Sequence, residues 1–251
     1  ASMIMSGGII AAIVGPELAV IGRTLTAIEY QGSFYLVTIT LIAAGIILFF
    51  YQSAPTAETH KQTSIRPLIE IIKNPSFVLA VCSAATAYLI MAFIMTGTPI
   101  SMHNHHGHSL LDTKWVLQSH IAAMFLPSLI APLLFKWFSI RLLMTAGLAC
   151  FGLTIIIGSI DTSVMGFWFQ LVILGIGWNF MFLSGTALLP STYRQGEQYK
   201  AQAFNDGFVF SLQAIAALTA GVAISVLSWQ EILLLCIAPM ALMFILLIKI
   251  K

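Results

Sequence analysis

The sequence predicts an all-α integral membrane protein with eight transmembrane helices, and two observations carry this prediction. Eight apolar stretches of spanning length account for most of the 251 residues. A helix needs about 20 apolar residues to cross the hydrocarbon core, where it satisfies its own backbone hydrogen bonds. Charged residues make up only 8% of the chain, against about 25% in a soluble domain. The stretches are Met3–Ile21, Gly32–Tyr51, Phe77–Ile100, Val116–Phe135, Leu142–Ile160, Val164–Leu188, Phe204–Leu227 and Ile232–Ile250.

Lysine and arginine residues fall almost entirely into alternate gaps between these stretches. The odd-numbered gaps hold only Arg23 and Lys114. An excess of basic residues marks cytoplasmic loops, so both termini are expected to be cytoplasmic. The net charge of +2 gives no sign of a nucleic-acid partner. The even-numbered gaps and the C-terminal tail hold Lys61, Arg66, Lys73, Lys136, Arg141, Arg194, Lys200, Lys249 and Lys251.

The longest gap, Gln52–Ser76, divides the chain into two spans before it and six after it. Its first half reads as a flexible linker. After Pro67, apolar residues three and four apart predict a short amphipathic helix lying along the membrane surface. Because the chain opens inside an apolar run, we expect it to start in the middle of a longer protein. The three cysteines lie inside spans and predict no disulfide.

Glycine and proline residues inside the spans have two readings. They allow close helix packing, or they are points at which helices bend during gating. In either case neighbouring groups must form hydrogen bonds with the backbone groups that these residues leave without a partner. Gly97 and Pro99 are expected to end the third span. The residues concerned are Gly15, Pro16, Gly97, Pro99, Pro127, Pro132, Gly175, Gly177 and Gly185.

Six segments in order resemble the major facilitator superfamily, whose members have two six-helix halves joined by a long cytoplasmic loop. Ser6–Ala19 is similar to the Gly-Pro signature of the fifth helix. Ile65–Phe77 and Met95–Met102 resemble the central loop and the seventh helix. The eighth, tenth and early eleventh helices of one bacterial branch are similar to Val116–Leu129, Leu174–Pro190 and Ala201–Phe210.

The resemblance implies a division of the chain. Residues 1–51 correspond to the last two helices of the N-terminal half, 52–76 to the central loop and 77–251 to the complete C-terminal half, so the first four helices are missing. The chain is then a fragment or a truncated gene product. The loop Ala131–Arg141 keeps Lys136 and Arg141 but has Phe135 and Phe138 where the family usually has an acid and a glycine, so no gating salt bridge is expected there.

The function that the resemblance implies is secondary active transport, not an enzymatic reaction. We expect a proton-coupled transporter of a small organic solute in the bacterial inner membrane, working by alternating access between the halves. It is expected to need no cofactor and to be monomeric at full length. The alternative is a truncated remnant that does not transport. A metal-binding membrane protein is a third reading.

Three ionisable residues inside spans are candidates for proton coupling, because such groups are costly in a membrane and usually functional. Asp206 is interpreted as a buried, proton-titrating carboxylate, or alternatively as an acid that caps the start of its helix. His120 either relays a proton, since imidazole titrates near neutrality, or is a hydrogen-bonded structural residue. Glu17 is expected to pair with Arg23 or with a missing helix, and to have a structural or gating role.

Polar and aromatic residues in the spans are candidates for the solute path. Gln213 follows Asp206 by seven residues and shares its helical face. A buried amide such as Asn179 needs a partner, either the solute or another helix, and Trp178 either stacks on a flat ring or packs. The path candidates are Asn179, Trp178, Gln213, Asn205, Gln118 and Thr96.

The third gap contains four histidines in six residues, HNHHGH. Histidine tracts bind zinc, nickel or copper, but the spacing matches no closed structural site. We therefore interpret the segment mainly as a solvated periplasmic loop and expect no metal, with weak capture by His103, His105, His106 and His108 as the alternative.

Overall fold

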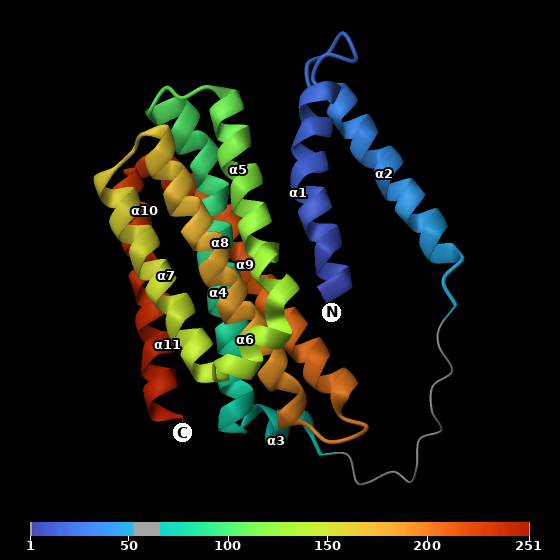
Figure 1. Ribbon diagram of the computed structural model, residues 1–251, viewed down its shortest axis with the longest axis vertical. Helices are drawn as coiled ribbons and strands as arrows, with labels where there is room; N and C mark the ends of the chain where they lie inside the picture. Colours follow the sequence, from blue (N-terminus) through green and yellow to red (C-terminus); the bar gives the residue numbers. More distant parts are fainter. Residues whose placement is uncertain (1, 53–65, 251) are drawn as a thin grey trace. The chain divides into compact units, whose positions relative to one another are not determined.

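A computed structural model describes residues 2–52 and 66–250, and every regular element in these ranges is helical (Figure 1). The α-helices are α1 (Ser2–Gly22), α2 (Gln31–Phe49), α3 (Leu68–Ile72), α4 (Pro75–Ile100), α5 (Leu110–Phe125), α6 (Ala131–Trp137), α7 (Ile140–Ile160), α8 (Val164–Leu188), α9 (Gln198–Val226), α10 (Trp229–Leu235) and α11 (Ile237–Lys249). A π-helical turn, η1 (Ser101–His105), follows α4, and 3₁₀ turns η2 (Leu126–Ile130) and η3 (Leu189–Thr192) follow α5 and α8.

The predicted fold class is confirmed. Within the described ranges, seven helical stretches are long and apolar enough to cross a membrane. They correspond to the second to eighth predicted spans, with α5, η2 and α6 forming one stretch and α10 and α11 another. The first predicted span is helical as α1, which is 21 residues long and contains Pro16.

The described residues form two compact units, one of residues 10–52 and one built mainly of residues 66–250. In the smaller unit, α1 and α2 form a helical hairpin in which the Ser33 hydroxyl donates to the Ala19 carbonyl at 2.7 Å. Arg23 in the connecting loop forms its ion pair with Glu29 at 2.6 Å. Its guanidinium also lies 5.4 Å from the ring centroid of Tyr30, which has a positive φ of 65°.

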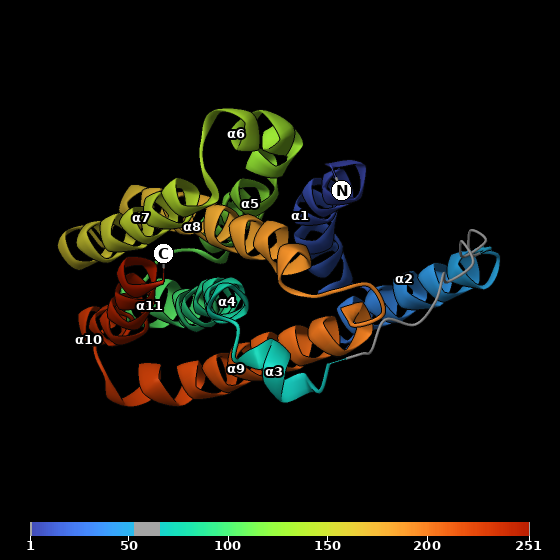
Figure 2. The same ribbon diagram turned by 90° about the horizontal axis from the view of Figure 1, so that it is seen from below.

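In the larger unit, α8 packs against α4, α5 and α7, and α9 packs mainly on α4. Figure 2, which views the bundle from one end, shows α4 between the row that contains α8 and the long helix α9. The main core lies where these helices meet and includes Ile90, Met144, Phe151 and Leu174, all with 0% exposure. α11 closes the bundle against α4 and α7.

Prolines interrupt two of the predicted spans. Pro127 and Pro132 have no N–H to donate and clash with the preceding turn, and the helix changes to 3₁₀ geometry between Leu126 and Ile130. Pro239 similarly leaves the Leu235 carbonyl without its usual donor, and α10 ends at Leu235. The fourth predicted span is therefore interrupted in the region of Pro127 and Pro132.

The third predicted span ends at Ile100, where α4 also ends, but Gly97 and Pro99 lie inside the helix and do not break it. α4 continues through both residues to Ile100, and the chain then makes the π-helical turn η1. There the His106 N–H donates to the Ser101 carbonyl at 3.1 Å, a bond across five residues. Proline near the last turn of a helix frees only one carbonyl, and the wider π turn absorbs the change without ending the helix.

The short helix predicted after Pro67 is present as α3. Its Ile71 is fully buried and packs in a small apolar cluster with Phe77, Leu189 and Ala201. α3 is therefore fixed to the end of the bundle by its apolar face. The first part of the linker, residues 53–65, lies outside the described residues.

Candidate functional site

Five aromatic side chains from four helices meet in the larger unit. This aromatic cluster consists of Tyr88 on α4, Phe125 on α5, Trp178 and Phe182 on α8, and Phe210 on α9. Trp178 and Phe182 stack, with ring centroids 4.9 Å apart and planes at 18°. Tyr88 lies edge-on to Trp178, Phe182 and Phe210 at 5.2, 5.3 and 5.5 Å. These spacings are those at which aromatic rings attract one another.

The side chains of the aromatic cluster range from buried to exposed. Trp178 is only 2% exposed, Tyr88 and Phe182 are half-buried, and Phe210 is 52% exposed. The Trp178 indole N–H is buried without a hydrogen-bond partner among the described residues. The sequence left open whether Trp178 stacks on a flat solute ring or packs against other helices, and in the structure it packs on Phe182.

Asp206 lies beside this cluster on α9. It precedes Phe210 by four residues, so the two share a helical face. The Asn205 amide donates to the Asp206 carboxylate at 2.9 Å. Gln213, half-buried, lies about two turns further along α9.

The structure corrects the expected burial of Asp206 and its expected place at the start of its helix, and does not test its role in proton coupling. The residue is exposed in the described chain and not buried, because α9 packs mainly on α4 and leaves this face open. It is not an N-terminal cap either, since α9 begins at Gln198, six residues before the predicted span, and has no acid in its first turn. Asp206 therefore lies in the third turn of the helix, on an uncovered face.

Asn179 joins α8 to the break between α5 and α6. Its amide donates to the Met124 carbonyl and to the Ser128 hydroxyl, each at 2.6 Å. These bonds join α8 to the segment around Pro127, so another helix is a partner of the Asn179 amide. The Asn179 side-chain oxygen remains buried without a partner among the described residues. Asn179 thus supports helix packing and retains one unused acceptor.

His120 is fully buried on α5. Its Nδ1 lies 2.7 Å from the Leu171 carbonyl of α8 and must carry a hydrogen to donate to it. In the neutral ring the hydrogen is then on Nδ1 and Nε2 is an acceptor, which has no partner among the described residues. This geometry matches the hydrogen-bonded structural alternative. Of the remaining path candidates, Gln118 is half-buried on α5 and Thr96 is exposed on α4.

The glycines of α8 lie where it approaches its neighbours most closely. A Cβ on Gly175 would lie 2.7 Å from the His120 carbonyl oxygen, and one on Gly177 would lie 2.9 Å from the Cβ of Cys150. Gly185 makes a similar approach to the Ala80 carbonyl of α4. All three positions match the close-packing reading of small residues. Gly15 and Pro16 lie inside α1, and Pro99 lies near the end of α4.

Three of the four histidines of the third gap form hydrogen bonds with backbone carbonyls. His103 and His106 bond the carbonyls of His108 and Ser101 at 2.9 and 2.8 Å. His108 bonds the Thr162 carbonyl at 2.8 Å, which ties this loop to the α7–α8 connection. No group of three or more histidine, cysteine, aspartate or glutamate residues in the described ranges is placed to hold a metal ion. His105 is exposed.

Sequence reasoning missed one buried ion pair at the opposite end of the bundle. Glu197, with 0% exposure, accepts from Arg66 Nη2 at 2.6 Å and Nε at 2.9 Å, and from the Arg66 and Arg194 backbone N–H groups. The bond from the Arg66 guanidinium lowers the pKa of Glu197 to about 2. Arg66 also donates to the Thr192 carbonyl at 3.4 Å. The end of the linker is therefore fixed to the α8–α9 connection.

These features define a polytopic membrane protein whose larger unit is a six-span helical bundle with an aromatic and carboxylate-bearing face. The family model described as Major Facilitator Superfamily matches residues 1–215. The chain belongs to this superfamily, as the sequence resemblance indicated.

Two relatives of this chain are named as transporters. The chain is 34% identical over 234 residues to a protein from Brucella anthropi named riboflavin transporter RfnT. The aligned region covers 92% of this chain and 58% of the relative. It is 33% identical over 221 residues to the uncharacterized MFS-type transporter YddS of Bacillus subtilis, covering 80% of this chain and 50% of the relative. The chain spans about half the length of the curated relatives it matches.

Proposed function

We propose that the protein carrying this chain is a secondary active transporter of a small organic solute with a flat conjugated ring. The observation that carries the proposal is the aromatic cluster, because it joins four helices and offers stacking surfaces of graded exposure. A relative is named a riboflavin transporter, and the isoalloxazine ring of riboflavin has this flat, conjugated chemistry. Stacked or edge-on aromatic contacts contribute about 0.5–1.5 kcal/mol each beyond area burial.

The transport path requires a complete protein with two halves. We assign residues 1–51 to the end of the N-terminal half, 52–76 to the central loop and 77–251 to the C-terminal half. Solute sites in such transporters lie near the bilayer midplane between the repeats. In this assignment one side of the path is formed by the helices that supply the cluster, α4, α5, α8 and α9. We also propose that the protein acts as a monomer.

Proton coupling is assigned to Asp206, with His120 as the second candidate and Glu17 in a structural or gating part. Support for Asp206 comes from its place on α9 one turn before Phe210, a member of the aromatic cluster. A carboxylate beside the ring site can exchange a proton in step with solute binding. His120 ranks lower because its Nδ1 is already used by the Leu171 carbonyl.

We expect purified full-length protein to quench riboflavin fluorescence on binding, and Tyr88→Leu to weaken that binding about tenfold. The substitution removes the ring that contacts three others, and the loss of one or two aromatic contacts is worth about 1.4 kcal/mol, a factor of ten in affinity. Fluorescence titration measures the dissociation constant, and uptake of labelled riboflavin into proteoliposomes tests transport.

Trp115→Leu is the matched control for the ring site. Trp115 stacks on Trp168 at 5.7 Å and lies ten residues before Phe125 on α5, about 15 Å along the helix. Replacing Trp115 removes its aromatic contact with Trp168 and leaves the cluster unchanged. The affinity of this variant for riboflavin should therefore be within twofold of that of the parent protein. Equal weakening by the two variants, or no binding of riboflavin by the parent protein, would exclude the flat-ring proposal.

The orientation follows from the distribution of basic residues, and we propose that the linker and the α8–α9 connection are cytoplasmic in a bacterial inner membrane. Single cysteines at Ala57 and Asn104, in a background without Cys82, Cys150 and Cys236, should react with an impermeant thiol reagent from opposite sides. Asn104 is expected to react in intact cells and Ala57 only after the membrane is opened. Reaction of both in intact cells would contradict this orientation.

A further inference from the structure

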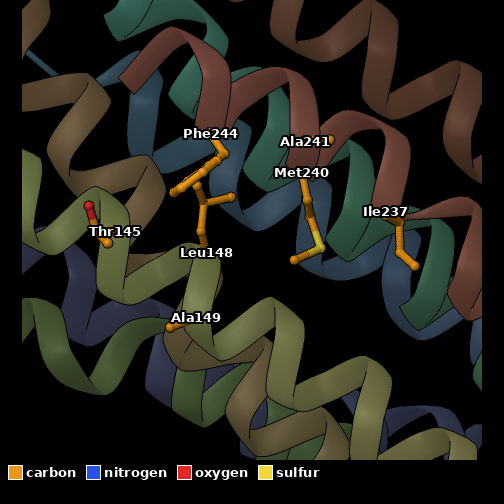
Figure 3. A pocket seen from close by; sticks show the side chains of 7 residues that line it. All are labelled: Thr145, Leu148, Ala149, Ile237, Met240, Ala241 and Phe244. Carbon is orange, nitrogen blue, oxygen red and sulfur yellow. The ribbon is translucent and has the colours of Figure 1, made fainter. Parts of the chain in front are cut away.

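An apolar groove runs between α7 and α11, on a part of the bundle that the proposed solute site does not use. Its volume is about 390 Å³, and Figure 3 shows Leu148 and Phe244 facing each other at one end with Met240 directed into the space between the helices. Small side chains leave the space open, since Ala149 and Ala241 lie on its two walls. The lining residues are Thr145, Leu148, Ala149, Ile237, Met240, Ala241 and Phe244.

The groove offers no free polar group to an occupant. Thr145 is the one lining residue with a polar side chain, and its hydroxyl donates to the Arg141 carbonyl at 2.9 Å within its own helix. An occupant along these walls must therefore be apolar, because a polar group buried there would lose its hydrogen bonds to water.

The surface beside the groove is also apolar. Leu153 and Ile156 on α7 are 48% and 56% exposed, and Leu242 and Ile245 on α11 are 60% and 46% exposed. Both helices belong to stretches that are long and apolar enough to span a membrane. Exposed apolar side chains on such helices contact lipid acyl chains, so the groove opens onto lipid.

A cationic group lies at one end of the groove. Arg141 precedes Thr145 by four residues and Leu148 by seven on α7, which places the three on one helical face. Its Nη1 donates to the Leu247 carbonyl at 3.1 Å, three residues beyond Phe244 on α11. The guanidinium therefore extends across both helices at the end of the groove.

The Arg141 charge is not neutralised by the described part of the chain. Within residues 2–52 and 66–250, Arg141 takes part in no ion pair, unlike Arg23 and Arg66, which pair with Glu29 and Glu197. A guanidinium has five N–H donors, and the Leu247 carbonyl takes one of them. Phosphate is the anion that matches a guanidinium fork, and basic groups at the membrane interface attract anionic lipids.

We propose that the α7–α11 groove and Arg141 together bind one anionic phospholipid, with an acyl chain in the groove and the phosphate on the guanidinium. The groove runs from Ile237 to Phe244, about 10 Å along the helix, so it takes roughly half of an acyl chain. The guanidinium lies on α7, one of the two helices that form the groove, and contacts α11, so one lipid molecule can reach both.

The test is lipid retention by the purified full-length protein. Delipidated protein is mixed with micelles containing equal amounts of phosphatidylglycerol and phosphatidylcholine, and native mass spectrometry counts each lipid bound. We expect the parent protein to retain at least fivefold more phosphatidylglycerol. Arg141→Gln should abolish this preference, whereas Lys200→Gln, which removes an exposed charge on α9, should leave it unchanged.

A second variant tests the groove itself. Ala241→Phe fills the space between the walls and should reduce retention of both lipids at least threefold. The melting temperature in lipid-free detergent reports whether each variant folds, and the rise in melting temperature on adding phosphatidylglycerol gives an independent measure of binding. Unchanged selectivity in Arg141→Gln, unchanged retention in Ala241→Phe, or equal protection by inorganic phosphate alone would each overturn the proposal.

Discussion

Replacing Glu197 by glutamine is expected to destabilise the protein by about 3 kcal/mol at neutral pH, the range for removing one partner of a buried ion pair. Glu197 has 0% exposure and takes both side-chain and backbone bonds from Arg66. Glutamine keeps the volume but removes the charge and turns one acceptor into an N–H group facing the Arg66 and Arg194 donors. Thermal melting in detergent measures the effect.

The destabilisation should depend on pH in a defined direction. The pKa of Glu197 falls from its ordinary 4.5 to about 2 in the folded protein, so the folded state favours the ionised form. Its contribution is complete above pH 4.5 and is lost as the pH falls from 4.5 toward 2. The difference in melting temperature between parent and Glu197→Gln should therefore narrow in this acidic window.

Glu70→Gln is the control for this prediction. Glu70 lies on α3, four residues from Arg66, but it is exposed. Removing an exposed charge of this kind typically costs 1 kcal/mol or less. If Glu197→Gln melts at the same temperature as Glu70→Gln, the buried pair does not hold the end of the linker to the α8–α9 connection.

The sequence predicted the spans well because each is a local property of one continuous apolar run. Helix starts are also local. Ser109 with Asp112 and Ser228 with Glu231 form capping boxes, a pattern readable from four residues. The start of α9 was missed, since its first two turns are polar and extend beyond the apolar run. That error led to the cap interpretation of Asp206.

The site was only partly predictable. Asp206, His120 and Asn179 could be selected from the sequence because few polar residues occur in the predicted spans. The aromatic cluster gave no such signal, since the chain has 17 phenylalanines and 6 tyrosines and nothing local tells which will meet. The Arg66–Glu197 pair joins residues 131 positions apart. Both arrangements depend on which helices pack together, and this is decided by tertiary structure.

Asp206→Asn is expected to abolish proton-driven accumulation of the solute in the full-length protein. One proton moved down a gradient of one pH unit is worth about 1.4 kcal/mol, which corresponds to a tenfold accumulation ratio. Asparagine has nearly the shape of aspartate and can still accept the bond from Asn205, but it cannot take up a proton at any working pH. Accumulation in proteoliposomes should therefore fall from about tenfold to about onefold.

Exchange of labelled for unlabelled solute separates loss of coupling from loss of folding or binding. Exchange needs no net proton movement, so Asp206→Asn should keep it while its pH dependence flattens. Asp161→Asn is the matched control, because Asp161 lies outside the spans and accepts from the Ser163 N–H at 2.9 Å, a bond that asparagine can keep. An unchanged pH profile in Asp206→Asn would remove Asp206 as the coupling acid, and His120→Gln would then be tested in the same assay.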